Sequence, residues 1–132
     1  MKYFTIAELC KSTTADRLGI NNRCRQEHVT ALTALVDNVL DPLRTWWGKP
    51  ITVNSGYRCP ELNAAVKGSK TSQHMVGEAA DIDTGDRQQN KLLFEYIRKN
   101  LPYDQLIDES NFAWVHVSYR ADGDNRKQVL KL

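Results

Sequence analysis

The sequence predicts an α+β fold with a small antiparallel sheet and helices packed on one side of it. Two observations lead to this fold class: helical patterns come first along the chain, and short β-rich runs dominate later. The length of 132 residues is that of one domain, so we expect a single domain over residues 1–132.

The N-terminal segment is expected to form two short helices. Thr5 is placed to cap a helix that runs through Cys10, and Glu8 at the third helical position completes a capping box. The run TTADRLGINN predicts a further turn of helix, which ends at Gly19 and leads into a polar loop.

A long helix is predicted from about Gln26 to Trp47. Proline has no N–H for the helical hydrogen bond, and Pro42 lies inside this segment, so we expect a kink or a restart near Asp41. His28 also lies in this helix and is interpreted as a surface or packing residue. The apolar residues recur every three or four positions, as on one face of a helix: Val29, Leu32, Val36, Val39, Leu43 and Trp46.

The middle of the chain contains short strand and helix patterns. ITVN (51–54) is a β-rich run, and Pro60 fits the first position of a short helix through about Val66. The loop KGSKTSQHMVG follows and is rich in small residues. EAADID then has the pattern of a strand.

The last part of the chain is expected to complete the sheet. Asp86 begins a helix that stops at Asn100 and Pro102. The segments DQLIDE and AWVHVSY, separated by a turn at SNF, predict a β-hairpin. The tail RKQVLKL can add an edge strand.

The composition is that of an ordinary globular protein, with 41% hydrophobic and 26% charged residues. The 18 basic residues nearly balance the 16 acidic ones, and a net charge of +2 does not indicate a nucleic-acid-binding protein. No segment approaches the ~20 apolar residues of a membrane span. We therefore expect a protein that neither binds nucleic acid nor inserts into a membrane. We also expect a monomer.

The N-terminal sequence MKYFTIAELCKS lacks the apolar stretch of a signal peptide. We therefore expect synthesis in the cytoplasm without a signal peptide. Action in the periplasm or the cell wall would then require release by another route.

The three cysteines, Cys10, Cys24 and Cys59, are an odd and sparse set. They form neither a disulfide framework nor a CxxC metal motif. We therefore expect three reduced thiols without a role.

The candidate functional residues include a histidine in a strand and an aspartate in another. Side chains alternate between the two faces of a strand, so in WVHVS the residue His116 lies opposite Val115 and Val117. The two valines are expected to meet the core, which leaves His116 on a face that can line a cleft. Asp81 lies between apolar residues, where a charge is costly unless it is paired or bound to a metal.

Together, His74, Asp81 and His116 would suit zinc, with one ion per chain. Imidazole nitrogen and carboxylate oxygen are common zinc ligands, and three protein ligands leave a fourth position for water, as in catalytic sites. Taken alone, however, the spacing of His74 and Asp81 is also that of an ordinary loop running into a strand. The residues by themselves leave both interpretations open.

Three blocks of the sequence resemble those of a known family. SGYRCPELN (55–63), SQHMVGEAADI (72–82) and WVHVS (114–118) are similar to the signature blocks of the zinc D-Ala-D-Ala carboxypeptidase family. That family includes D-Ala-D-Ala dipeptidases and the L-alanyl-D-glutamate endopeptidases of phage lysins. The opening FTIAEL and the segment VLDPLR…GKPI resemble its short phage and bacterial members. The resemblance implies a hedgehog/D-Ala-D-Ala-peptidase-like fold.

The resemblance also implies roles for individual residues. His74, Asp81 and His116 match the metal ligands of the family pattern. Arg58 matches an arginine that polarises the scissile carbonyl or holds substrate, and the alternative for it is a structural salt bridge. Ser72 matches a serine near the metal, for which substrate binding and turn capping are both open.

One position departs from the pattern. Many members place the catalytic carboxylate three residues before the last histidine, where this chain has Ala113. Alanine cannot move a proton, so another carboxylate must act or the protein is not an enzyme. Asp108 and Glu109 lie just across the hairpin turn, where the short members carry an acidic residue.

The register of the hairpin distinguishes these two acids. With a turn centred near residues 111–112, Glu109 lies opposite Trp114, and Trp114 shares the face of His116. Glu109 would then face the metal while Asp108 points away. A slip of one residue would reverse the assignment. Glu109 is therefore our candidate base, with Asp108 as the alternative.

The function that the resemblance implies is a zinc metallopeptidase that acts on peptidoglycan stem peptides, as a D-Ala-D-Ala carboxypeptidase or an L-Ala-D-Glu endopeptidase. A phage or prophage lysin would fit this activity. The alternative is a non-catalytic zinc-containing module that binds cell-wall peptide. A third interpretation is a metal-free structural domain.

Overall fold

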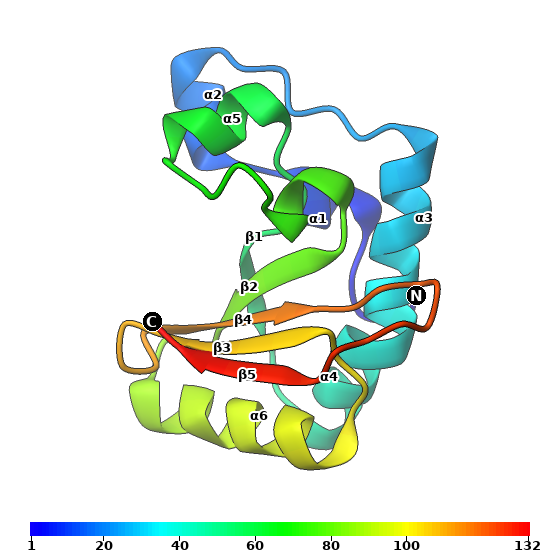
Figure 1. The fold of residues 1–132 in the computed structure, drawn as a ribbon. Coiled ribbons are helices and arrows are strands. Elements are labelled where there is room, and N and C mark those ends of the chain that lie inside the picture. Colours follow the sequence, from blue (N-terminus) through cyan, green and yellow to red (C-terminus); the bar gives the residue numbers. More distant parts are fainter.

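The computed structural model describes residues 1–132 as an α+β fold built on a five-stranded sheet (Figure 1). The strand order is β1-β2-β4-β3-β5. The strands are β1 (Thr52–Ser55), β2 (Ala79–Asp83), β3 (Gln105–Glu109), β4 (Trp114–Ser118) and β5 (Gln128–Lys131).

The prediction of a purely antiparallel sheet is wrong at one edge, because β5 pairs with β3 in parallel. The other three pairings are antiparallel. The connection over residues 119–127 carries the chain past the start of β3, where the amide of Gln128 donates to the carbonyl of Asp104. The tail therefore enters the sheet beside the beginning of β3 and runs in the same direction.

The helices begin and end close to the predicted residues, except for η2 (Gln73–Val76), which lies in a segment predicted to be a loop. Thr5 accepts a hydrogen bond from the amide of Glu8, Gly19 ends its helix in the left-handed conformation, and Asp86 caps the helix that follows β2. None of the helices combines the length and the apolar character of a membrane span. They are α1 (Ile6–Cys10), α2 (Thr13–Leu18), α3 (Gln26–Leu35), η1 (Val36–Leu40), α4 (Asp41–Trp47), α5 (Pro60–Ala65), η2 (Gln73–Val76) and α6 (Arg87–Asn100).

The long predicted helix restarts at Asp41, as expected, but a π-helical segment precedes the restart. In η1 the amide of Asp41 donates to the carbonyl of Val36, five residues earlier. Pro42 follows directly and has no N–H to give to the preceding turn. A π-bulge absorbs this local mismatch without ending the helix, so α3, η1 and α4 form one continuous rod.

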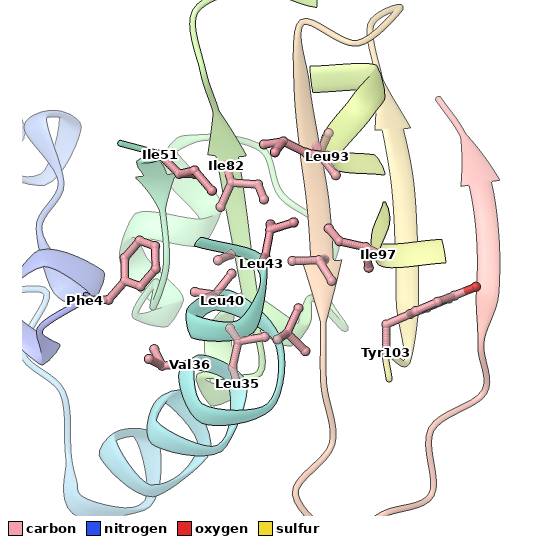
Figure 2. Close-up of a cluster of buried hydrophobic side chains, with 14 of the residues drawn as sticks. Phe4, Leu35, Val36, Leu40, Leu43, Ile51, Ile82, Leu93, Ile97 and Tyr103 are labelled. Carbon is pink, nitrogen blue, oxygen red and sulfur yellow. The ribbon is translucent and has the colours of Figure 1, made fainter. Parts of the chain in front are cut away.

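The core lies between one face of the sheet and the helices α3, η1, α4 and α6 (Figure 2). The central strands contribute alternate residues to it, including Ile82 from β2 and Val115 and Val117 from β4, all fully buried. Each such side chain stabilises the fold by roughly 1.5–3 kcal/mol. Because side chains alternate, the residues between them face the opposite side of the sheet, which forms the floor of a cleft.

Cys10 and Cys24 form a disulfide bond, so the expectation of three reduced thiols is wrong for this pair. Only Cys59 is free. The two half-cystines are 14 residues apart and belong to no recognisable spacing motif, which is why the sequence did not reveal the pair. Asn22 fastens the same region, because its side chain donates to the carbonyls of Cys10 and Tyr57 and accepts from the amide of Cys59.

We expect replacement of both half-cystines by serine (C10S/C24S) to lower the free energy of unfolding by ~2–4 kcal/mol, since the bond no longer restricts the unfolded chain. Urea denaturation of the oxidised proteins would measure the change. Cys59→Ser is the matched control, and it should unfold close to wild type because serine can also cap α5. Equal stability of the double variant and the control would contradict the expectation.

Candidate metal centre

Three side chains from three elements converge on one face of the sheet. Asp81 on β2 and His116 on β4 lie directly opposite each other in the register of the two central strands. His74 comes from η2, the 3₁₀ turn that precedes β2. One potential ligand atom from each of the three residues lies within 4.8 Å of the other two. The structure thus brings together all three predicted metal ligands.

The carboxylate is the centre of this cluster. The Oδ1 atom of Asp81 lies 3.0 Å from Nδ1 of His116 and 3.3 Å from Nε2 of His74. Burial of Asp81 raises the pKa of its carboxyl, but hydrogen bonds and charge from the two histidines outweigh burial and hold that pKa well below its usual range. The cluster therefore presents an ionised carboxylate between two imidazoles.

A backbone carbonyl fixes the orientation of His74. The Nδ1 atom of this buried ring lies 2.7 Å from the oxygen of Gly56, so Nδ1–H donates there and Nε2 keeps its lone pair for a cation. Gly56 cannot carry a side chain, because a Cβ atom there would lie 2.2 Å from the carbonyl oxygen of Leu9. The close approach of the SGYR loop to α1 thus aims the metal-binding nitrogen of His74.

The donor set fits zinc. Two imidazole nitrogens and one carboxylate oxygen match the ligands of catalytic zinc sites, and a carbonyl that orients a ligand histidine is typical of them. The distances among the donors describe a pocket small enough for one ion. This fit is independent of the motif resemblance.

Arg58 lies beside the cluster and is held by its neighbours. Its amide donates to the carbonyl of His74, and its Nη2 donates to Oγ of Ser72 at 3.3 Å. Its Nε is buried without a partner. Burial lowers the pKa of the guanidinium, while the negative charges of Asp81 and Glu109 act against this. The guanidinium is thus held by Ser72 rather than by a salt bridge, and its other Nη hydrogens have no protein partner at the cleft.

Ser72 has a capping role in the structure. Its hydroxyl accepts from the amide of His74 at 3.1 Å and so begins η2. The same side chain lines the cleft. Capping and substrate contact are therefore compatible for this residue.

The hairpin has the register that the sequence predicted, with Glu109 opposite Trp114 and Ile107 opposite His116. Glu109 is half-buried and lines the cleft with the metal cluster. Burial raises the pKa of its carboxyl, and the negative charge of Asp81 raises it further. Asp108 is buried on the other face, where its carboxylate accepts from the amide of Phe112 at 2.6 Å.

The cleft has a volume of about 690 Å³, which is enough for a short stretch of peptide. Gln73 and Arg126 are among the lining residues that were not predicted from the sequence. Gln73 sits next to the ligand histidine, and only its position in the SQH block could have drawn attention to it. Arg126 comes from the segment between β4 and β5 and carries no local sequence signal.

Two comparisons with known proteins gave matches. The model of the family described as peptidase M15 matches residues 2–118. A zinc D-Ala-D-Ala carboxypeptidase from Streptomyces albus G is 38% identical over 76 aligned residues. That alignment covers 50% of this chain and 30% of the relative, so the chain spans well under half of the length of this relative.

Proposed function

The chain belongs to the peptidase M15 family, and on this premise we propose that it is a zinc metallopeptidase that hydrolyses an amide bond in the stem peptides of peptidoglycan. The observation that carries the proposal is the convergence of His74, Asp81 and His116 in a cleft that Arg58 and Glu109 also line. The two bond types that we propose are D-Ala-D-Ala and L-Ala-D-Glu. A phage or prophage lysin is the proposed setting, and the proposed fold relationship is to the hedgehog/D-Ala-D-Ala-peptidase group.

We assign the metal to His74, Asp81 and His116, as one zinc ion per chain. When bound there, zinc supplies Lewis acidity, which makes water acidic enough to ionise near neutral pH and polarises a carbonyl. The chain contributes the remaining chemistry through residues on the same face of the sheet.

Glu109 is the proposed general base and acid. Its carboxylate takes a proton from the attacking water as the new C–O bond forms at the scissile carbonyl. The same carboxyl then delivers that proton to the leaving nitrogen as the C–N bond breaks, which yields a carboxylic acid and an amine. A carboxyl with a raised pKa, as burial gives Glu109, is suited to both steps.

Arg58 is the proposed stabiliser of the oxyanion, and Ser72 a contact for substrate. The Nη hydrogens of Arg58 that Ser72 does not accept are donors that become most favourable when negative charge develops on the carbonyl oxygen. Ser72 holds the guanidinium from one side. The fixed fork of donors suits an oxyanion or a carboxylate.

We expect Arg58→Ala to lower kcat by about 100-fold or more, because one oxyanion donor is lost. Zinc content by elemental analysis should remain at the wild-type level, since Arg58 is not a ligand. Arg58→Lys keeps the positive charge but lacks the forked donors of the guanidinium, so its kcat should lie between those of wild type and Arg58→Ala. A collapsed melting temperature in both variants, rather than a folded and slow enzyme, would show that Arg58 is structural.

Incubation of the zinc-loaded protein with purified muropeptides, followed by mass spectrometry, tests the proposed function. Cleavage should release either a terminal D-alanine or the peptide beyond L-alanine, and the mass of the product identifies the bond. Removal of zinc by a chelator should abolish the products. Binding of muropeptide without any product would instead support the zinc-containing binding module.

A further inference from the structure

Arg126 lies on the wall of the cleft, in the segment that joins β4 to β5. It precedes β5 and lines both the main cleft and a neighbouring depression that shares Ser72 and Gln73 with it. The two depressions thus meet at Arg126 and Gln73, and Gln73 directly precedes the metal-binding residue His74. A substrate that crosses the metal centre in this direction would pass the guanidinium.

A buried carboxylate holds this guanidinium in place. Asp104 is fully buried, and its Oδ1 accepts from both the amide and Nε of Arg126, at 2.8 and 3.0 Å. Its Oδ2 accepts from Nη2 of Arg126 at 2.8 Å and from Nε2 of Gln73 at 3.0 Å. The pKa of Asp104 is lowered, chiefly by the hydrogen bond from the Arg126 side chain. Arg126 is therefore pre-oriented before any ligand arrives.

The outer edge of the same guanidinium has no partner in the protein. Nη1 of Arg126 makes no hydrogen bond, and 52% of the side chain is exposed. Gln73 supports the buried carboxylate from the other side, because its Nε2 donates to Asp104 and also to Glu78. A fixed donor edge without a partner thus lies on this wall of the cleft.

The charges along this wall favour an anion. Three cations and two carboxylates line the main cleft, and a divalent metal would make it more positive still. The neighbouring depression adds Lys70 and Arg120, the second of which is paired with Asp122. The two acids of this depression, Glu78 and Asp104, already accept hydrogen bonds from Gln73. Asp104 also accepts a hydrogen bond from Arg126.

We infer that Arg126 is a specificity residue, which binds a free carboxylate of the peptide substrate at a distance from the scissile amide. A guanidinium with a free edge binds a carboxylate in preference to a neutral amide, because the hydrogen bonds are charge-assisted. This inference rests on the proposed peptidase function and deepens it by naming an anionic feature of the substrate.

The test uses four stem peptides, in which either the C-terminal carboxylate or the D-glutamate carboxylate is free or amidated. For zinc-loaded wild type we expect kcat/KM to be about 10-fold higher for the acid than for the amide in one of the two pairs. The pair that shows the preference identifies which carboxylate is bound. Arg126→Gln should bring that ratio close to one by slowing only the acid peptide.

Two further variants separate recognition from folding and general charge. Lys131→Gln also removes one positive charge, but from an exposed side chain of β5 that does not line the cleft. Its ratio of kcat/KM between the acid and the amide peptide should therefore match that of wild type. Asp104→Asn combined with Arg126→Gln avoids a buried unpaired carboxylate and should also have a ratio near one. An unchanged ratio in both Arg126 variants, or no preference in wild type, would overturn the inference.

Failure of the proposed function would appear differently. If wild type cleaves none of the four peptides, the peptidase proposal fails, and calorimetric dissociation constants for the same peptides then decide the inference. Tighter binding of one acid peptide by wild type, and its loss in Arg126→Gln, would support the carboxylate site. Equal affinities for acids and amides would refute it.

Discussion

Glu109→Gln is expected to lower kcat on a stem peptide by about 100-fold or more while the protein still binds zinc. Glutamine has nearly the shape of glutamate but cannot take up a proton. Glu109 lines the cleft on the same face of the sheet as His116, two positions along β3 from the partner of that histidine. The measurement is steady-state hydrolysis of a muropeptide, with zinc content determined on the same samples.

Asp108→Asn is the matched control for that experiment. The two acids are neighbours on β3, but Asp108 faces the core side and accepts from the amide of Phe112. Its replacement keeps an oxygen that can accept this bond, so activity should stay within a few-fold of wild type. An inactive Asp108→Asn beside an active Glu109→Gln would show that the base is assigned to the wrong residue. If neither change slows an active wild type, the base lies outside the hairpin.

His116→Ala is expected to remove most of the zinc and, with it, all measurable hydrolysis. Wild type purified without chelator should carry about one zinc per chain by elemental analysis. The variant retains two of the three ligands and leaves the carboxylate of Asp81 without one of its two histidine neighbours. Full zinc content after this change would rule out the proposed ligand set.

His28→Ala provides the control for loss of a histidine. His28 lies on α3, where its Nδ1 accepts a hydrogen bond from the amide of Arg25. Its ring stacks on that of Tyr57, with 4.2 Å between the ring centroids. It is not part of the metal cluster. Its replacement should cost some stability but leave zinc at about one per chain.

Local patterns in the sequence were sufficient to predict most of the helices and the hairpin. Helix caps act within a few residues, as at Thr5 and Asp86, and the face of a strand residue follows from strict alternation. The parallel pairing of β5 and the bond between Cys10 and Cys24 could not be predicted in this way. Both depend on how distant segments meet, which no local pattern records.

The candidate site shows the same division. The metal cluster was predicted because its residues lie in recognisable blocks and because alternation placed His116 away from the core. The carbonyl of Gly56 that orients His74 and the pair of Asp104 with Arg126 were not predicted. These contacts join residues 18 and 22 positions apart through side-chain packing. Their positions become visible only when the loops are folded against the sheet.

The two central strands interleave residues of the core with residues of the site. Ile82 follows Asp81, and the valines on either side of His116 are fully buried. Substitution at a cleft position therefore leaves the neighbouring core position intact, so the chemistry of this face can diverge while the scaffold is retained. Insertion or deletion of one residue in either strand would turn the core side chains toward the cleft and the cleft side chains toward the core. These strands should thus tolerate changes of residue type far better than changes of length.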